Sequence, residues 1–242
     1  MMGRRDFVLM LSGTVLAGCQ TTLGGGNLNL QSALNSAGLA APLTDGEIGA
    51  GLKEALKIGT AHVVAQVGAP DGYYADQAIR IPLPGDLDKV HDVLTRIGLN
   101  ALTADLELKL NRAAERAAPE AKAVFWQAIT EMTLRDVRTI WQGPDDAATQ
   151  YFRGKMTPPL TTRFTPIVLD AMSDVGAVRA YDRMMAKYEA VPFVPDVKAD
   201  LTRYTVGKSL DGLFHYVGKE EAAIRRDPAK RTTQLLQRVF GV

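Results

Sequence analysis

Two short stretches of the chain gather side chains of the kinds that bind or transform polar molecules. In the first, Asn111, Arg112 and Glu115 lie within five residues. A carboxylate such as Glu115 can serve as a general base, and the planar guanidinium of Arg112 can hold a carboxylate or phosphate through two hydrogen bonds. The stretch therefore suits a base beside a substrate clamp. A solvated helix face, or a buried network between two helix layers, would use the same residues.

The second stretch is a dense polar cluster formed by Asp146, Gln150, Tyr151 and Arg153. Side chains three and four residues apart are neighbours on a helix, so Asp146 can reach Gln150. The cluster can form the wall of a polar pocket, and that wall could face the first stretch. A capped helix that ties its neighbours together through hydrogen bonds is the alternative interpretation.

The usual motifs of nucleophilic and metal catalysis do not occur in the sequence. His62, His91 and His215 are far apart and have no i, i+4 partner, which a zinc site on a helix would use. Gly207-Lys208-Ser209 resembles the end of a phosphate loop, but Thr202 stands where the first glycine belongs and no strand precedes it. A Gly-x-Ser-x-Gly elbow and an Asp-rich calcium loop are also missing. We therefore expect neither a metal nor a cofactor.

The C-terminal part of the chain is rich in charged residues. Glu221 and Arg225 have the i, i+4 spacing of a helical ion pair. Lys230, Arg231 and Arg238 could contact anionic lipid or a protein partner. A solvated helix face explains all five residues as well.

The composition is that of an ordinary globular protein. The 242 residues carry a net charge of +1, and 46% of them are hydrophobic, which is enough for a sizeable core. A charge so balanced gives no general attraction to nucleic acid, so we expect no nucleic-acid partner. The only cysteine is Cys19, and a disulfide within the chain is therefore impossible.

The N-terminus explains that single cysteine. Arg4 and Arg5 give a positive start, and residues 7–17 form an apolar run too short to span a bilayer as a helix. The following Leu16-Ala17-Gly18-Cys19 resembles a bacterial lipobox, in which small residues precede the cleavage site. We predict a signal peptide over residues 1–18 and lipidation of Cys19, by diacylglycerol on the thiol and an acyl chain such as palmitate on the amine. Several acyl chains anchor a protein stably in a membrane.

The export route and the membrane are less sharply indicated. Arg4, Arg5 and Phe7 match the twin-arginine signal, although Gly3 and Val8 depart from it, and a general secretory signal remains the alternative. Gln20 after the cysteine favours the outer over the inner membrane. Removal of residues 1–18 takes away two arginines and one aspartate, which brings the formal charge from +1 to zero. We expect a lipoprotein of the cell envelope, anchored on the periplasmic side.

Behind the anchor the pattern is helical. Residues 19–43, rich in Gly, Asn, Ser and Gln, are typical of a flexible tether, whereas residues 44–242 predict one all-α domain of about eight to ten helices. Glycines 49, 51 and 59 inside the first helix indicate that another helix packs close to it. We expect helices over 44–67, 87–97, 103–118, from 119 onward, and over 133–142, 144–155, 160–189, 200–217 and 228–240.

Prolines mark the expected breaks between these helices. Residues 81–85, with Pro82 and Pro84, predict an extended connector. Pro158 and Pro159 should end one helix, and Pro166 should kink the next or mark a boundary in it.

The helix expected over 103–118 must position the first polar stretch. Its apolar stripe contains Leu102, Leu106 and Leu110. At about 100° per residue, Asn111 and Glu115 lie roughly opposite this stripe and one turn apart. The two side chains therefore share one face.

Several motifs stand in a fixed order along the chain. They are Ile81-Pro82-Leu83-Pro84, Asn111-Arg112-Ala113-Ala114-Glu115, Asp146-Ala147-Ala148-Thr149-Gln150-Tyr151-Phe152, Asp211-Gly212-Leu213-Phe214 and Ile224-Arg225-Arg226-Asp227-Pro228, with Leu235-Leu236 and Val239-Phe240. Together these motifs resemble the Domain of Unknown Function 4197 family of proteobacterial envelope proteins. The resemblance covers nearly all of the chain after Leu43 and implies a helical, exported protein without an assigned activity, so no catalytic residue is carried over.

Three functional hypotheses follow. The first is a binding or accessory protein for an apolar or amphipathic ligand or for an envelope partner. The second is a hydrolase of envelope material with Glu115 as general base, which requires Glu115 to converge with Gln150 or Tyr151 in an open concave site. The third is a purely structural envelope protein. The missing nucleophile and metal motifs favour the first.

Overall fold

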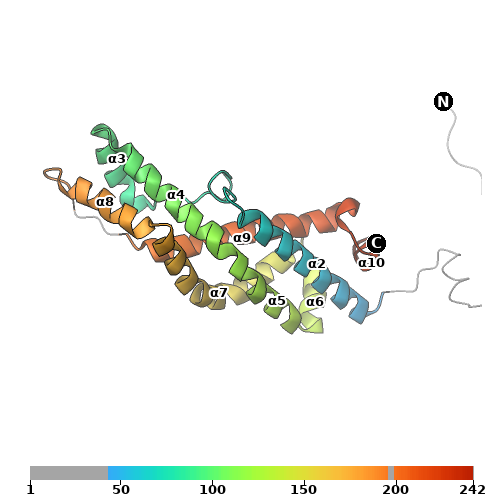
Figure 1. Cartoon of the computed structure of the whole chain (residues 1–242). Coiled ribbons are helices and arrows are strands. Elements are labelled where there is room, and N and C mark those ends of the chain that lie inside the picture. Colours follow the sequence, from blue (N-terminus) through green and yellow to red (C-terminus); the bar gives the residue numbers. More distant parts are fainter. Residues whose placement is uncertain (1–42, 196–198, 242) are drawn as a thin grey trace, which may run out of the picture. The chain divides into compact units, whose positions relative to one another are not determined.

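The computed structural model of the chain describes residues 43–195 and 199–241, which belong to one compact unit, Leu43–Val242 (Figure 1). These residues form α-helices, short 3-10 turns and loops, and none of them lies in a strand. The predicted all-α domain is thereby confirmed. Cys19, the expected signal peptide and most of the expected tether lie outside the described residues.

The helices follow one another through short connections, except after α2 and after α8. The α-helices are α2 (Asp45–Val67), α3 (Asp88–Arg96), α4 (Asn100–Ala117), α5 (Ala121–Glu131), α6 (Leu134–Trp141), α7 (Ala147–Asp174), α8 (Ala177–Glu189), α9 (Leu201–Arg226) and α10 (Gln234–Phe240). The 3-10 turns are η1 (Gly85–Leu87), η2 (Ala118–Glu120) and η3 (Pro228–Lys230). Within the described ranges, no helix is both long and apolar enough to cross a membrane.

Local sequence signals set several of these boundaries. Thr44 caps α2, and its backbone N–H donates to the Glu47 carboxylate, as predicted for a capping box. Thr133 and Asp136 form a second capping box at the start of α6. Gly98 follows α3 with a φ of 76°, a left-handed conformation that glycine adopts without strain.

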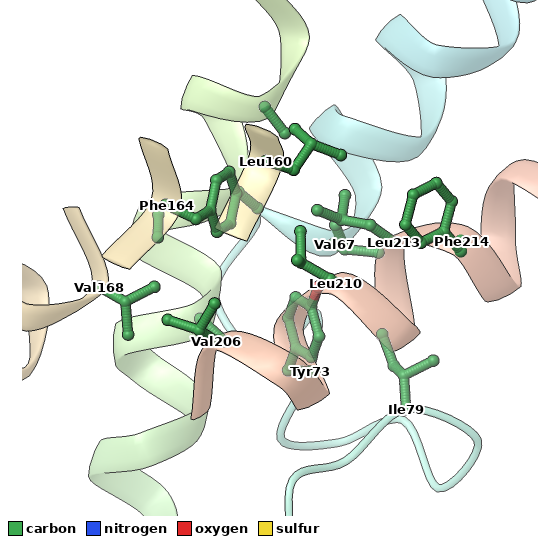
Figure 2. Packing of buried hydrophobic residues seen from close by; sticks show 14 of the residues in the cluster. Val67, Tyr73, Ile79, Leu160, Phe164, Val168, Val206, Leu210, Leu213 and Phe214 are labelled. Atoms are coloured by element: carbon green, nitrogen blue, oxygen red, sulfur yellow. The ribbon is translucent and has the colours of Figure 1, made fainter. Parts of the chain in front are cut away.

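Four long helices enclose most of the core. Helix α9 packs against α2, α4 and α7, and α4 also packs against α7. Figure 2 shows side chains of α7 and α9, among them Phe164, Leu210 and Leu213, meeting between the helices. The shorter helices surround this centre: α5, α6 and α10 pack on α2, while α8 packs on α3, α4 and α7.

Gly51 permits the closest of the predicted approaches to α2. A Cβ atom at this position would lie only 2.7 Å from Cγ2 of Val239 in α10, well inside normal contact distance. A Cβ at Gly49 or Gly59 would meet its neighbours no closer than 3.7 and 3.6 Å, which is ordinary contact. The expected close packing is therefore confirmed at Gly51.

Helix α7 corrects the prediction that prolines divide this region. It runs unbroken from Ala147 to Asp174 through Pro158, Pro159 and Pro166. Each proline removes one helical hydrogen bond and costs about 3 kcal/mol in a helix interior. The prolines and the residues four positions before them are exposed, so water can bond the freed carbonyls. An uninterrupted buried stripe compensates for the cost, and it consists of Phe152, Met156, Leu160, Phe164 and Val168.

The boundary between α7 and α8 is a second correction. The sequence predicted one helix over residues 160–189, but the chain turns at Gly176, whose φ is 75°. Helix α9, in turn, is longer than predicted and continues to Arg226. Glycine serves as a helix stop at Gly176, while the three prolines, on the exposed side of α7, do not.

Candidate functional site

The segment of residues 68–84, here called the connecting loop, links α2 to η1 and is held by Asn111 of α4. The Ile81 N–H donates to Oδ1 of Asn111 over 2.8 Å, and Nδ2 of Asn111 donates to the Ile81 carbonyl over 2.8 Å. Nδ2 also donates to the Glu107 carbonyl of its own helix. Asn111 is fully buried, so these contacts use its amide and leave it no access to a ligand.

Glu115 holds the same loop one helical turn further on. Its Oε1 accepts the N–H groups of Tyr73 and Tyr74, both over 3.1 Å, and its Oε2 accepts a 2.6 Å bond from Arg112. The other end of the Arg112 guanidinium donates to Asp71 of the loop over 2.7 Å. The hydrogen bond to Glu115 is the largest cause that raises the pKa of Arg112. A buried charge needs such partners to offset its lost hydration.

Helix α9 fixes the opposite side of the connecting loop. The hydroxyl of Tyr73 donates to the Ser209 carbonyl over 2.6 Å, and burial raises the pKa of this phenol. The ring lies against Gly212, where a Cβ atom would stand 2.6 Å from Cε1 of Tyr73. Figure 2 shows Tyr73 and Ile79 against α9. The Tyr216 hydroxyl also donates to Asp76, so the loop is fixed by two helices at once.

This arrangement builds a shallow pocket of about 280 Å³ beside the loop, here called the loop pocket. The loop, α7 and α9 each contribute to its lining, and the lining contains four basic side chains but one acid. The residues are Ala78, Ile79, Arg80, Arg153, Lys208, Asp211, Gly212 and His215.

Neighbouring groups orient the basic side chains around the loop pocket. Arg80 donates to Glu107 over 2.6 Å and stacks 4.3 Å above the Tyr74 ring, and the hydrogen bond to Glu107 is the main cause that raises its pKa. Arg153 donates to Asp211 over 3.1 Å. Lys208 forms no ion pair with another residue of the described part. The cations keep free donors, which suits the binding of a carboxylate or phosphate.

The structure separates the residues that the sequence suggested as one polar site. Asp146 and Gln150 bond to each other on the exposed start of α7, over 2.9 Å. Tyr151 faces a different hollow, between α5 and α7, and Arg153 lies in the loop pocket. Asn111, Arg112 and Glu115 support that pocket only by holding its loop. The convergence of Glu115 with Gln150 or Tyr151 that a hydrolase requires does not occur.

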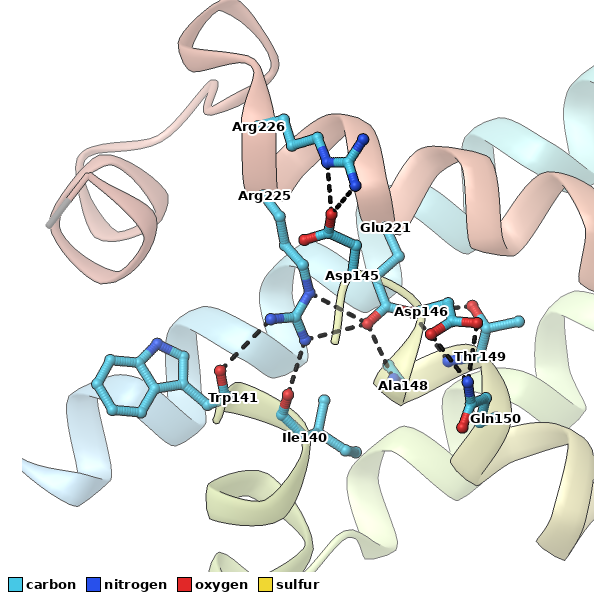
Figure 3. Close-up of polar contacts among 10 residues, drawn as sticks. All are labelled: Ile140, Trp141, Asp145, Asp146, Ala148, Thr149, Gln150, Glu221, Arg225 and Arg226. Carbon is cyan, nitrogen blue, oxygen red and sulfur yellow. Dashed lines mark hydrogen bonds and ion pairs between the residues drawn. The ribbon is translucent and has the colours of Figure 1, made fainter. Parts of the chain in front are cut away.

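A buried network surrounds Glu221 (Figure 3). The sequence spacing did not predict this network, because a solvated helix face explained the same residues. Glu221 accepts the N–H groups of Ala148 and Thr149, each over 2.9 Å, at the start of α7. Arg225 donates to Glu221 over 3.1 Å and to the Ile140 carbonyl at the end of α6 over 2.8 Å. The pair therefore joins the facing ends of two helices.

No sequence signal distinguished this network from an exposed ion pair. Arg226, the next residue, pairs with Asp145 at the surface, so identical side chains in adjacent positions have opposite surroundings. The basic tail residues also have partners in the fold: Arg231 donates to the Arg225 carbonyl, and Arg238 pairs with Glu47. Arg80, Lys208 and His215 were missed as site residues because three separate segments bring the loop pocket together.

Metal ligation has no geometric basis within residues 43–195 and 199–241, where no three His, Cys, Asp or Glu side chains gather as a metal would require. The loop pocket also offers no hydroxyl or thiol among its lining side chains. The cationic donors of the lining suit an anionic group, and the lining lacks the hydroxyl or thiol that nucleophilic catalysis most often uses.

Comparison with known proteins places the chain in a family. Neither the curated proteins nor the solved structures contain a match to this chain. A family model described as "Protein of unknown function (DUF4197)" matches residues 42–241. The motifs that carried the sequence resemblance include Asn111, Glu115 and Gly212, which hold the connecting loop. Since the match covers nearly the whole chain, the protein belongs to the DUF4197 family.

Proposed function

We propose that the protein is a binding or accessory protein of the bacterial cell envelope, and that its loop pocket binds the anionic group of a small ligand or partner. The carrying observation is the lining, in which Arg80, Arg153, Lys208 and His215 face a single acid, Asp211. Charge-assisted hydrogen bonds from guanidinium and ammonium groups are the strong contacts in such recognition.

The fixed connecting loop supports a binding role. Asn111 and Glu115 hold its backbone on one side and Tyr73 anchors it on the other, so the loop wall of the pocket forms without a ligand. A preformed site loses less conformational entropy when it binds. The hydrolase alternative has less support, because both carboxylate oxygens of Glu115 already accept hydrogen bonds from the protein.

One hollow with a mostly apolar lining, between α2, α9 and α10, encloses only about 20 Å³. This space is close to that of one water-sized probe, so a lipid chain does not fit it. The loop pocket is lined by Arg80, Arg153 and Lys208, so its proposed ligand is a small carboxylate or phosphate.

Binding of inorganic phosphate and of succinate tests the proposal, with the full chain carrying Cys19→Ser to avoid lipidation. The ring signals of His215 in NMR spectra report on the pocket, and those of His62 and His91 serve as internal references. We expect a saturable shift of His215 with either anion. Arg153→Ala or Lys208→Ala should weaken binding about tenfold, which is about 1.4 kcal/mol.

Arg179→Ala is the matched control, since this exposed arginine of α8 lies outside the loop pocket. It should leave the affinity unchanged. A His215 signal that does not respond, or an equal loss in the Arg179 variant, would exclude the loop pocket as an anion site.

Membrane anchoring through Cys19 is a separate part of the proposal and rests on the lipobox sequence alone. Metabolic labelling with palmitate in a Gram-negative host should label the wild-type protein and not the Cys19→Ser variant. The wild-type protein should fractionate with membranes. Label that persists in the variant would contradict the anchor without affecting the loop pocket.

A further inference from the structure

The hollow that Tyr151 faces lies between α5 and α7 and is larger than the loop pocket. We name it the α5–α7 cleft; its volume is about 360 Å³, within the range typical of small-molecule sites. Its lining combines an apolar wall with charged ends. The residues are Val124, Gln127, Ala128, Glu131, Thr133, Asp136, Tyr151, Lys155, Met156, Pro159 and Arg163.

The apolar wall comes from both helices. Val124 and Ala128 lie one turn apart on α5, and Met156 and Pro159 lie opposite on α7. A methionine thioether adapts to irregular ligand shapes, which suits a wall that contacts a flexible chain. This wall can therefore receive the hydrocarbon part of a ligand.

The acids of the α5–α7 cleft already have partners. Asp136 caps α6 through the backbone N–H and hydroxyl of Thr133, and these bonds lower its pKa to about 2. Glu131 accepts a 2.9 Å hydrogen bond from Gln127. Neither carboxylate is left to attract a cation strongly.

The two cations of the cleft, Arg163 and Lys155, retain hydrogen-bond donors for a ligand. Arg163 is exposed and forms no ion pair or hydrogen bond with any other residue of the described part. Lys155 donates to the Tyr151 hydroxyl over 3.2 Å and contacts Asp136 only loosely, at 3.5 Å. The planar guanidinium of Arg163 can therefore take a carboxylate through two hydrogen bonds.

We propose that the α5–α7 cleft is a second binding site, for an amphipathic carboxylate whose chain lies on the wall of Val124, Ala128, Met156 and Pro159 and whose carboxylate pairs with Arg163. Lys155 contributes positive charge at the other end. The site is independent of the loop pocket, with which it shares no lining residue.

Octanoate is a suitable probe, used with the full Cys19→Ser chain below the concentration at which it forms micelles. The methyl signal of Met156, observed after ¹³C labelling of methionine, reports on the wall. Met172 and Met184 lie in the core away from the cleft and serve as internal references. We expect a saturable shift at Met156 with octanoate, and a response at least tenfold weaker with acetate, which lacks the chain, and with neutral octanamide.

Variants then locate the carboxylate. Arg163→Ala should weaken octanoate binding about tenfold and Arg163→Lys less, because lysine keeps the charge but not the planar pair of donors. Both variants should fold normally, because this exposed side chain has no polar partner among residues 43–195 and 199–241. Arg179→Ala is the matched control, because this exposed arginine of α8 lines neither pocket, and it should have no effect on octanoate. Octanamide that binds as tightly as octanoate, or an affinity unchanged in Arg163→Ala, would overturn the proposal.

Discussion

Glu115 and Glu221 are two buried carboxylates with closely similar partners in different regions of the molecule. Each has a side chain that is 5% exposed, accepts two backbone N–H groups from another segment, and pairs with an arginine on its own helix. They differ in what they hold. Glu115 holds the connecting loop, whereas Glu221 holds the first turn of α7.

The two arginines show the same difference. The Arg112 side chain is 33% exposed, and its second contact is with Asp71 of the loop. The Arg225 side chain is 10% exposed, and it donates to the last carbonyls of α6. The Glu221 pair therefore places negative charge at a helix N-terminus and positive charge at a helix C-terminus, where the helix dipoles favour each.

The same buried pair of a carboxylate and an arginine serves two purposes in the molecule. At Glu221 it joins helices that carry core residues such as Phe152, so its loss should destabilise the whole domain. At Glu115 it fixes a wall of the loop pocket, so its loss should mainly release the loop.

The largest effect should come from Glu221→Ala. The substitution leaves Arg225 buried without its carboxylate and frees two N–H groups of α7, and breaking a buried pair in this way typically costs about 3–5 kcal/mol. The free energy of unfolding, measured by urea denaturation, should fall by about this amount. A loss below about 1 kcal/mol would show that the network contributes little.

Glu115→Ala should have a smaller effect on global stability, about 1–3 kcal/mol for the unsatisfied groups, because Arg112 can turn toward water. Its distinctive effect is local. Hydrogen exchange at the Tyr73 and Tyr74 amides should accelerate well beyond the global unfolding rate, and phosphate binding at His215 should weaken. If these amides stay as protected as the core in the variant, the two carboxylates do not differ as described.

Gly212→Ala tests the loop from the α9 side. The new methyl would overlap the Tyr73 ring, and overpacking of this kind costs about 1–3 kcal/mol. Gly207→Ala is the matched control on the same helix, because a Cβ there meets nothing within 4 Å. Alanine at this control position should stabilise by up to about 1 kcal/mol, and equal thermal shifts in the two variants would refute the close contact.

The smallest effect concerns Asp136, a half-buried carboxylate that accepts hydrogen bonds from Thr133, the cap of its own helix. Its pKa is lowered to about 2 from 3.8, so its contribution is fully present above the unfolded value and is lost as pH falls through the folded one. The wild-type protein should exceed Asp136→Asn in stability at pH 5, and the gap should close between pH 4 and 2. A stability difference that does not change with pH would show that the charge of Asp136 is not its cause.

Sequence patterns predicted the helical class and the helix starts near residues 44 and 133 because those features are local. Thr44 with Glu47 and Thr133 with Asp136 form their capping boxes within four residues. The prolines of α7 led to the wrong prediction of a helix break, because the energetic cost of a proline can be read from the local sequence. The buried stripe that outweighs this cost depends on distant partners in α4 and α9. Tertiary packing overrides local preference in such cases.

The candidate site could be predicted only in part. Asn111, Glu115 and Arg153 stood out by type, but the burial of Asn111 and Glu115 depends on the course of the connecting loop. Glu221 and Arg225 have the spacing of any surface pair, and only the approach of α6 and α7 makes them a buried network. Long-range pairing of this kind leaves no mark on sequence spacing.

The contact between α10 and Gly51 of α2 has a consequence for the order of folding. Gly51 and Val239 lie near opposite ends of the sequence of the compact unit. While the chain is being synthesised, the surface of α2 around Gly51 stays uncovered until α10 has been made. Contacts so distant in sequence form late and slowly, so α2 would be the last face of the nascent domain to leave chaperone protection.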